Sequence, residues 1–321
     1  MRSSLHENGI LMRANMLSLT FAMLTAFEMA AQTLPVSTGR LERHADFPSK
    51  HVPPRHVDVW LPDGYRPDQR YAVLYMHDGQ MLFDSSATWN HQEWGVDETL
   101  GRLIRNGSVQ DCIVVGIWNT GARRHAEYFP QSPYESLTND ERGRIEAAQR
   151  TGGHSVFSGI PVCSNEYLRF IVEELKPFVD NHYATRRERE ATFIAGSSMG
   201  GLISLYAICE YPEVFGGAAC LSTHWPGIFS MDDNPVPETF FRYMDRKLPD
   251  PRTHRIYFDL GTETLDSLYP PLQRRADEVM RKRGYGTENW MTRTWPRQDH
   301  SERSWRGRLE IPITFLLGLK R

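Results

Sequence analysis

The chain has 321 residues, of which 40% are hydrophobic and 24% are charged, as in an ordinary globular protein. These proportions exclude a disordered chain, and no apolar run reaches the ~18 residues of a membrane-spanning helix. The formal net charge is −3, from 37 basic and 40 acidic residues. Such a near balance gives no reason to expect a nucleic-acid partner.

The first 31 residues are predicted to be a signal peptide. Arg13 is followed by a largely apolar run at 16–27, and the small residues Ala30 and Ala31 come shortly after it. A basic start, a short apolar stretch and small residues are typical of a secretory leader. The run is too short to span a bilayer stably, and a buried amphipathic helix is the alternative. We therefore expect an exported protein, periplasmic or secreted, without stable membrane insertion.

Residues 32–321 are predicted to form one domain in which strands and helices alternate. Strands are expected at 38–46, 56–61, 71–76, 112–118, 192–195, 218–221, 256–260 and 290–295. Helical patterns are expected at 94–104, 168–179, 199–209, 272–283 and 304–317. The first two strands read as antiparallel, and the later runs are continuously apolar, as in strands covered on both faces. This order predicts an α/β sandwich with a mostly parallel central sheet and helices on both faces.

A polar stretch at about 121–161 does not fit the alternation. Forty residues is long for a loop in a compact domain, and such loops are often functional. We expect an insertion beside the active site, with one short helix near 140–150.

Ser198 is the candidate nucleophile. It is the central residue of Gly-Ser-Ser-Met-Gly at 196–200, a G-x-S-x-G pattern between a predicted strand and a predicted helix. A serine on such a tight turn is exposed for attack, and the glycines let the strand and the helix approach each other. The start of the following helix adds a positive field where an oxyanion would form.

A serine hydroxyl needs a base, and histidine is the usual one. In this arrangement the chain order is Ser, acid, His. His300 follows the last predicted strand, where the base is expected. His224 comes too early, and His254 precedes a strand instead of following one.

The acid is expected after the strand at 256–260. Asp266 is favoured, Glu263 is the alternative, and Asp259, within the strand, is the third candidate. The acid accepts the Nδ1 proton of the histidine and so fixes its tautomer. Sequence alone leaves this choice open.

The oxyanion hole requires two backbone N–H groups. One is expected from Met199, directly after the nucleophile. The other is expected from the loop after the strand at 71–76, where we assign it to Gln80.

Several motifs together resemble a known family. They are His77-Asp78-Gly79-Gln80, Gly116-Ile117-Trp118-Asn119-Thr120, Glu127-Tyr128-Phe129-Pro130, Gly-Ser-Ser-Met-Gly-Gly at 196–201, Asp259-x-Gly261-Thr262, Leu265-Asp266 and His300-x-Glu302-x-x-Trp305. Over residues 50–320 the chain is similar to the "putative esterase" family of α/β-hydrolases, which includes esterase D-like, feruloyl and enterochelin esterases. The resemblance implies Ser198 as nucleophile, His300 as base and an acid after Gly261. It also implies Trp118, Asn119 and Tyr128 as substrate contacts.

The predicted activity is therefore that of a serine esterase acting on a small-molecule or carbohydrate-linked ester. No cofactor and no metal are implied, since the four cysteines form no C-x-x-C pair and no zinc-like spacing is present. An acyltransferase on the same fold is the first alternative. A non-catalytic module that binds carbohydrate or a partner protein is the second.

Overall fold

The computed structural model describes residues 31–150 and 152–319 of the chain. Residues 1–30 of the predicted leader lie outside these ranges, so export stays a prediction. Among the described residues, no helix combines the length and the apolar character needed to cross a membrane.

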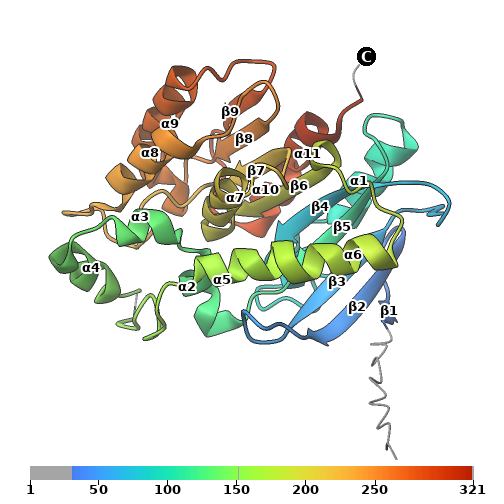
Figure 1. The fold of residues 1–321 in the computed structure, drawn as a ribbon, viewed down its shortest axis with the longest axis horizontal. Coiled ribbons are helices and arrows are strands. Elements are labelled where there is room, and N and C mark those ends of the chain that lie inside the picture. The colour runs from blue at the N-terminus through green and yellow to red at the C-terminus, as the bar shows by residue number, and fades with distance from the viewer. Residues whose placement is uncertain (1–30, 151, 320–321) are drawn as a thin grey trace, which may run out of the picture. The chain divides into compact units, whose positions relative to one another are not determined.

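The described residues contain one nine-stranded sheet with the order β1-β2-β3-β5-β4-β6-β7-β8-β9 (Figure 1). The strands are β1 Gln32–Leu34, β2 Arg40–Phe47, β3 Arg55–Leu61, β4 Ala72–His77, β5 Cys112–Ile117, β6 Thr192–Ser197, β7 Gly217–Leu221, β8 Arg255–Leu260 and β9 Trp290–Thr294. The β1–β2, β2–β3 and β3–β5 pairs are antiparallel, and the other pairs are parallel. The predicted α/β class, the antiparallel N-terminal strands and the mostly parallel sheet are confirmed. The short edge strand β1 was not predicted.

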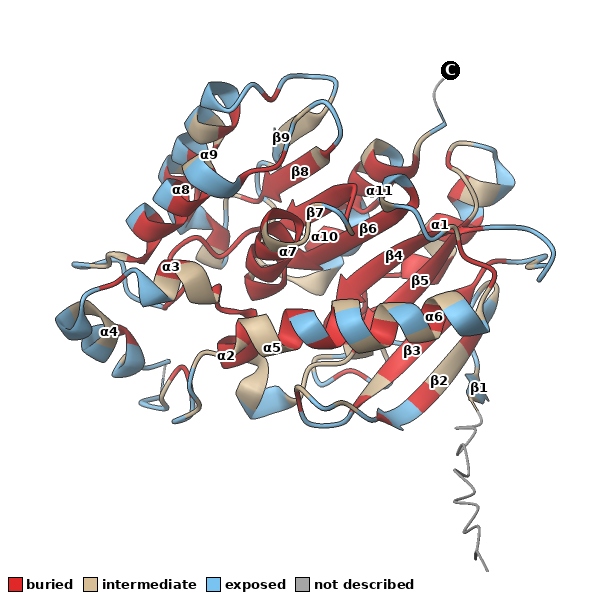
Figure 2. Ribbon diagram, viewed as in Figure 1, coloured by how far each residue is buried: buried red, intermediate tan, exposed pale blue. Residues whose placement is uncertain are grey.

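The central strands are buried on both faces, which explains their continuous apolar sequences (Figure 2). Along β4, Val73 and Tyr75 belong to one hydrophobic cluster, whereas Leu74 and Met76 belong to another. Because side chains alternate along a strand, these clusters lie on opposite faces of the sheet. A sheet covered on both sides in this way has no need for polar residues along its strands.

Helices cover both faces. The first cluster takes its helical residues mainly from α2 Arg124–Tyr128, the continuous helix of α5 Ser164–Arg169, η3 Phe170–Leu175 and α6 Lys176–His182, and from α7 Met199–Glu210, α8 Val236–Lys247 and α9 Pro270–Lys282. The second takes them from α1 Val96–Arg105, α10 Glu302–Arg308 and α11 Glu310–Leu317. The helix predicted at 304–317 is therefore two helices. Pro312 in the first turn of α11 is consistent with this break, since proline lacks the N–H that would continue α10.

The stretch at 121–161 is more helical than expected. Besides α4 Asn139–Glu146, which matches the single predicted helix, it contains η2 Gly121–Arg123, α2 and α3 Gln131–Glu135. Glu127 of α2 is fully buried, and its carboxylate pairs with Arg55 of β3 at 2.8 Å. This contact fixes α2 against β3. Short polar helices of this kind carry too little apolar periodicity to be recognised beforehand.

Candidate active site

Ser198 lies on a sharp turn between β6 and α7. Its backbone angles, φ 57° and ψ −120°, belong to a region that only glycine adopts without strain. A side chain at Gly196 would approach the Gly200 backbone to 2.8 Å, so glycine is required there. The Ser198 N–H donates to the Leu221 carbonyl at 2.9 Å, and its carbonyl accepts from the His224 N–H at 3.1 Å. The surrounding structure thus holds the serine in a strained conformation typical of exposed nucleophiles.

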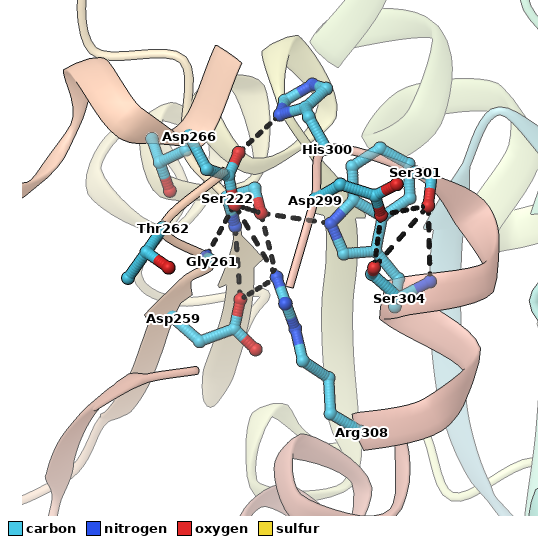
Figure 3. A network of polar contacts seen from close by, with 12 residues as sticks. Ser222, Asp259, Gly261, Thr262, Asp266, Asp299, His300, Ser301, Ser304 and Arg308 are labelled. Atoms are coloured by element: carbon cyan, nitrogen blue, oxygen red, sulfur yellow. Dashed lines mark hydrogen bonds and ion pairs between the residues drawn. The ribbon is translucent and has the colours of Figure 1, made fainter. Parts of the chain in front are cut away.

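His300 and Asp266 are hydrogen-bonded, with 2.5 Å between Nδ1 and Oδ1 (Figure 3). His300 lies in the loop after β9, and Asp266 lies in η5 Thr264–Leu268 after β8. Two main-chain bonds join these loops, since the N–H groups of Thr262 and Glu263 both donate to the Gln298 carbonyl at 3.0 Å. The two chain segments are therefore held in a fixed mutual position.

The geometry separates the three candidate acids. Asp266 is completely buried and contacts His300, whereas Glu263 is exposed and its one side-chain bond is from Thr262. Asp259 is buried, but it pairs with Arg308 at 2.9 Å. The structure thus brings Asp266 to His300 and leaves the other two carboxylates elsewhere.

Asp266 is held in its charged form. Burial disfavours the carboxylate, but the hydrogen bond and charge of His300 outweigh it. Together with hydrogen bonds from Ser222 and Gly261, the interactions with His300 keep the pKa of Asp266 below its ordinary value. The Ser222 hydroxyl donates to Oδ2 at 2.6 Å, and the Gly261 N–H donates to the same oxygen at 2.5 Å. A carboxylate ionised and fixed in this way can orient an imidazole.

Ser198 and His300 both line a cavity of about 750 Å³. This volume lies within the range of small-molecule sites. Among the predicted oxyanion residues, Gln80 also lines it, in η1 Gly79–Met81 after β4, and Met199 is the first residue of α7. Their N–H groups stay predicted oxyanion donors.

The three predicted substrate contacts lie in different places. Asn119 lines the cavity, but Trp118 and Tyr128 are not among its lining residues. The Trp118 indole donates to Asp58 at 2.8 Å on the antiparallel part of the sheet. Tyr128 is fully buried, and its hydroxyl accepts from the Asp78 N–H at 3.3 Å. Neither aromatic side chain therefore lines the cavity, although Tyr128 contacts the main chain of Asp78, which does.

A charged pair that sequence reasoning did not single out lies in the cavity wall. Arg124 of α2 binds the Asp78 carboxylate in a bidentate manner, with both N···O distances at 2.7 Å. Asn119 donates to the same carboxylate at 2.8 Å. Although burial opposes the charge of Asp78, Arg124 and Asn119 hold the pKa of this carboxyl below its usual value. Arg150 lines the same cavity. The stretch at 121–161 was expected beside the active site, but no motif within it singles out these two arginines.

Indole rings form another unpredicted part of the lining. Trp89, Trp94 and Trp305 all border the cavity, and Trp89 is 83% exposed. Trp305 is buried, packs edge-on against the His300 ring at 5.0 Å between centroids, and donates from Nε1 to Ser222 at 3.0 Å. It therefore anchors α10 as well as forming part of the wall.

Two further histidines near the site are buried and neutral. His224 shares a 2.7 Å hydrogen bond with the Tyr269 hydroxyl, and His77 shares one of 2.8 Å with Tyr167. Burial lowers the pKa of each to about 3. They consequently remain uncharged where His300 would act as a base.

No group of three or more metal-ligating side chains suited to a metal ion occurs at 31–150 or 152–319. The four cysteines, all within these ranges, are unpaired.

The profile of the protein family described as "Putative esterase" matches residues 53–310. The uncharacterized protein YbbA of Bacillus subtilis is 26% identical over 173 residues, which cover 53% of this chain and 58% of YbbA. The ferri-bacillibactin esterase BesA of Bacillus subtilis is 26% identical over 193 residues, covering 57% of this chain and 60% of BesA. The match thus spans less than two thirds of either relative.

Among solved structures, one described as a ferulic acid esterase superposes with a TM-score of 0.61 at 18% identity. The superposition covers 90% of this chain and 98% of that one. At this identity the likeness concerns the fold.

Proposed function

The chain belongs to the "Putative esterase" family, and on that premise we propose that it hydrolyses carboxylic esters through an acyl-enzyme on Ser198. His300 is the general base, and Asp266 orients it. The observation that carries this proposal is the His300–Asp266 hydrogen bond, 2.5 Å long, at the cavity that the strained Ser198 also lines.

The proposed reaction has two halves. In the first, the Ser198 oxygen attacks the ester carbonyl while Nε2 of His300 takes the serine proton. The N–H groups of Met199 and Gln80 stabilise the oxyanion, and the imidazolium then protonates the leaving alkoxide. In the second half, water, deprotonated by the same imidazole, attacks the acyl-enzyme and releases the acid.

The lining of the cavity favours an aromatic acyl group. Trp89, which is 83% exposed, offers a flat apolar surface on which an aromatic ring packs in an offset or edge-on arrangement, and the buried rings of Trp94 and Trp305 also border the cavity. The ferulic acid esterase structure is named for an aromatic acid. We expect kcat/KM to be higher for methyl ferulate than for methyl octanoate, and Trp89→Ala to reduce this ratio. An equal or reversed preference in the wild-type protein would contradict the assignment of substrate.

The decisive test of the reaction compares two neighbouring serines. Ser198→Ala should lower kcat on p-nitrophenyl acetate by at least about 10⁴-fold, because the nucleophile is lost. Ser197→Ala, the matched control one residue earlier, should keep kcat within about tenfold of wild type. Ser198→Ala protein that is folded and hydrolyses the ester near the wild-type rate would refute the proposal.

Export is part of the same proposal, and it rests on the apolar run at 16–27 after Arg13. Fractionation of the native host should recover a shortened chain outside the cytosol. Recovery of the intact N-terminus in the cytosol would contradict export.

A further inference from the structure

Another buried charged pair lies next to Asp266, on the side away from His300. Arg308, the last residue of α10, pairs with Asp259 of β8, and their side chains are 2% and 0% exposed (Figure 3). One guanidinium nitrogen, Nη2, lies 2.9 Å from Asp259, 2.8 Å from the Ser222 hydroxyl oxygen and 3.9 Å from Oδ2 of Asp266. A single cation is therefore shared between two buried carboxylates.

The Ser222 hydroxyl connects this cation to Asp266. It accepts from Arg308 and from the Trp305 indole, so its only proton goes to Oδ2 of Asp266. Arg308 thereby fixes the direction in which the serine donates. With Oδ2 held by Ser222 and Gly261, the other oxygen of Asp266 is directed at His300.

Stability alone gives little reason for such an arrangement. A buried ion pair costs so much desolvation that apolar replacements are often neutral or stabilising. Here burial raises the pKa of Asp259, and the Arg308 charge is the main opposing influence. The pair nevertheless lies where it contacts both the serine and the carboxylate that hold the imidazole.

We propose that Arg308 is a positioning residue of the hydrolytic site, which fixes Asp266 through Ser222 and, balanced by Asp259, sets the charge beside the His300–Asp266 pair. This inference rests on the proposed function. It assigns to Arg308 and Asp259 a role in the reaction although neither lines the cavity.

Among the described residues, the charged side chains that line the cavity with His300 are Asp78, Arg124, Arg150 and Glu302, and Asp299 directly precedes His300 in the chain. Around Asp266 lie His300, Ser222, the Gly261 N–H and Arg308. The nearby His224 is neutral, with a pKa of about 3. Burial raises the pKa of Tyr269, which faces His300 and Asp266, and of Tyr257, whose hydroxyl donates to Asp259 at 3.0 Å.

The charge balance can be tested on the acid limb of the pH profile of kcat/KM, which reports the free base. Asp259→Asn removes a negative charge, so Asp266 becomes the remaining carboxylate next to the positive charge of Arg308. The imidazolium becomes less favourable, and the acid limb should move to lower pH by about 0.5 to 1 unit. Adding Arg308→Gln removes the positive charge as well and should return the limb toward its wild-type position.

The double variant also tests positioning. Without Arg308 the Ser222 hydroxyl loses one anchor, so kcat on the pH plateau should fall about tenfold or more, with KM within about twofold. Arg306→Gln is the matched control on the same helix. The Arg306 side chain is 45% exposed and pairs with Glu93 and Glu98. The acid limb of kcat/KM should therefore not move in Arg306→Gln.

The outcomes separate this inference from the proposed function. If Ser198→Ala stays active, the proposed function fails and this inference fails with it. If Ser198→Ala is inactive but Asp259→Asn leaves the acid limb of kcat/KM in place, only the role of Arg308 is overturned. The same holds if adding Arg308→Gln to Asp259→Asn does not reverse the shift of the acid limb. Should the double variant not fold, the limb of Asp259→Asn alone decides.

Discussion

Asp266→Asn should trap His300 in the wrong tautomer. Oδ2 of Asp266 accepts from the Ser222 hydroxyl at 2.6 Å and from the Gly261 N–H at 2.5 Å. An asparagine must therefore place its carbonyl oxygen there, and its amide nitrogen then faces Nδ1 of His300. Nδ1 of His300 then has to accept a hydrogen bond from this amide, so the imidazole proton moves to Nε2. This is the nitrogen that must be free to deprotonate Ser198.

The size of this effect follows from the loss of the base. A carboxylate-to-amide change that leaves the geometry intact in a serine triad lowers kcat by about 10⁴-fold, or about 5.5 kcal/mol of barrier. KM should change little, since Asp266 is fully buried and does not line the cavity. The assay is steady-state hydrolysis of p-nitrophenyl acetate, with circular dichroism to establish that the variant is folded.

Glu263→Gln is the control for this prediction. Glu263 precedes Asp266 by three residues and is exposed, so its amide variant should keep kcat within about twofold of wild type. Folded Asp266→Asn protein with kcat within tenfold of wild type would refute the reasoning. A comparable loss in both variants would also contradict it.

Three further predictions concern stability and close packing. Ser198→Gly should unfold with a free energy about 1 kcal/mol above that of Ser198→Ala, because glycine accepts φ 57° and ψ −120° without strain; equal thermal midpoints would contradict the strain. His77 and His224 have folded pKa values of about 3, below the ~6.5 of the unfolded chain, so between these values the unfolded state binds more protons. Stability should therefore fall as the pH is lowered, by about 2 kcal/mol for each histidine from pH 7 to 5, and an unchanged urea midpoint would argue against their burial. Gly261→Ala should reduce kcat because its methyl group would lie 3.0 Å from Oδ2 of Asp266 and collide with a main-chain carbonyl, and full activity would show that the loop adapts.

Much of the fold follows from local pattern. Strands β4 to β8 were predictable because their continuous apolar runs reflect burial on both faces of the sheet, whereas the edge strand β9 is only partly buried. Ser198 and His300 could be proposed from the sequence because a nucleophile turn has a sequence signature and the order of its partners along the chain follows from the topology.

The choice of acid needed the structure. Asp266 and Glu263 lie three residues apart in one loop, and only the turn of η5 shows that Asp266 points inward. No periodicity exists in so short a segment from which its direction could be read.

The charged contacts around the site were also beyond sequence reasoning. Arg308 and Asp259 are 49 positions apart, and Arg124 and Asp78 are 46 positions apart. Such pairs depend on how distant segments pack, and no local propensity encodes them.

The most direct test of the central claim is intact-mass spectrometry after treatment with a fluorophosphonate probe. The account predicts one covalent adduct on the wild-type protein and none on Ser198→Ala, because an activated serine reacts and an unactivated one does not. Folded wild-type protein that forms no adduct, or an adduct that persists on Ser198→Ala, would contradict the assignment of Ser198 as the nucleophile.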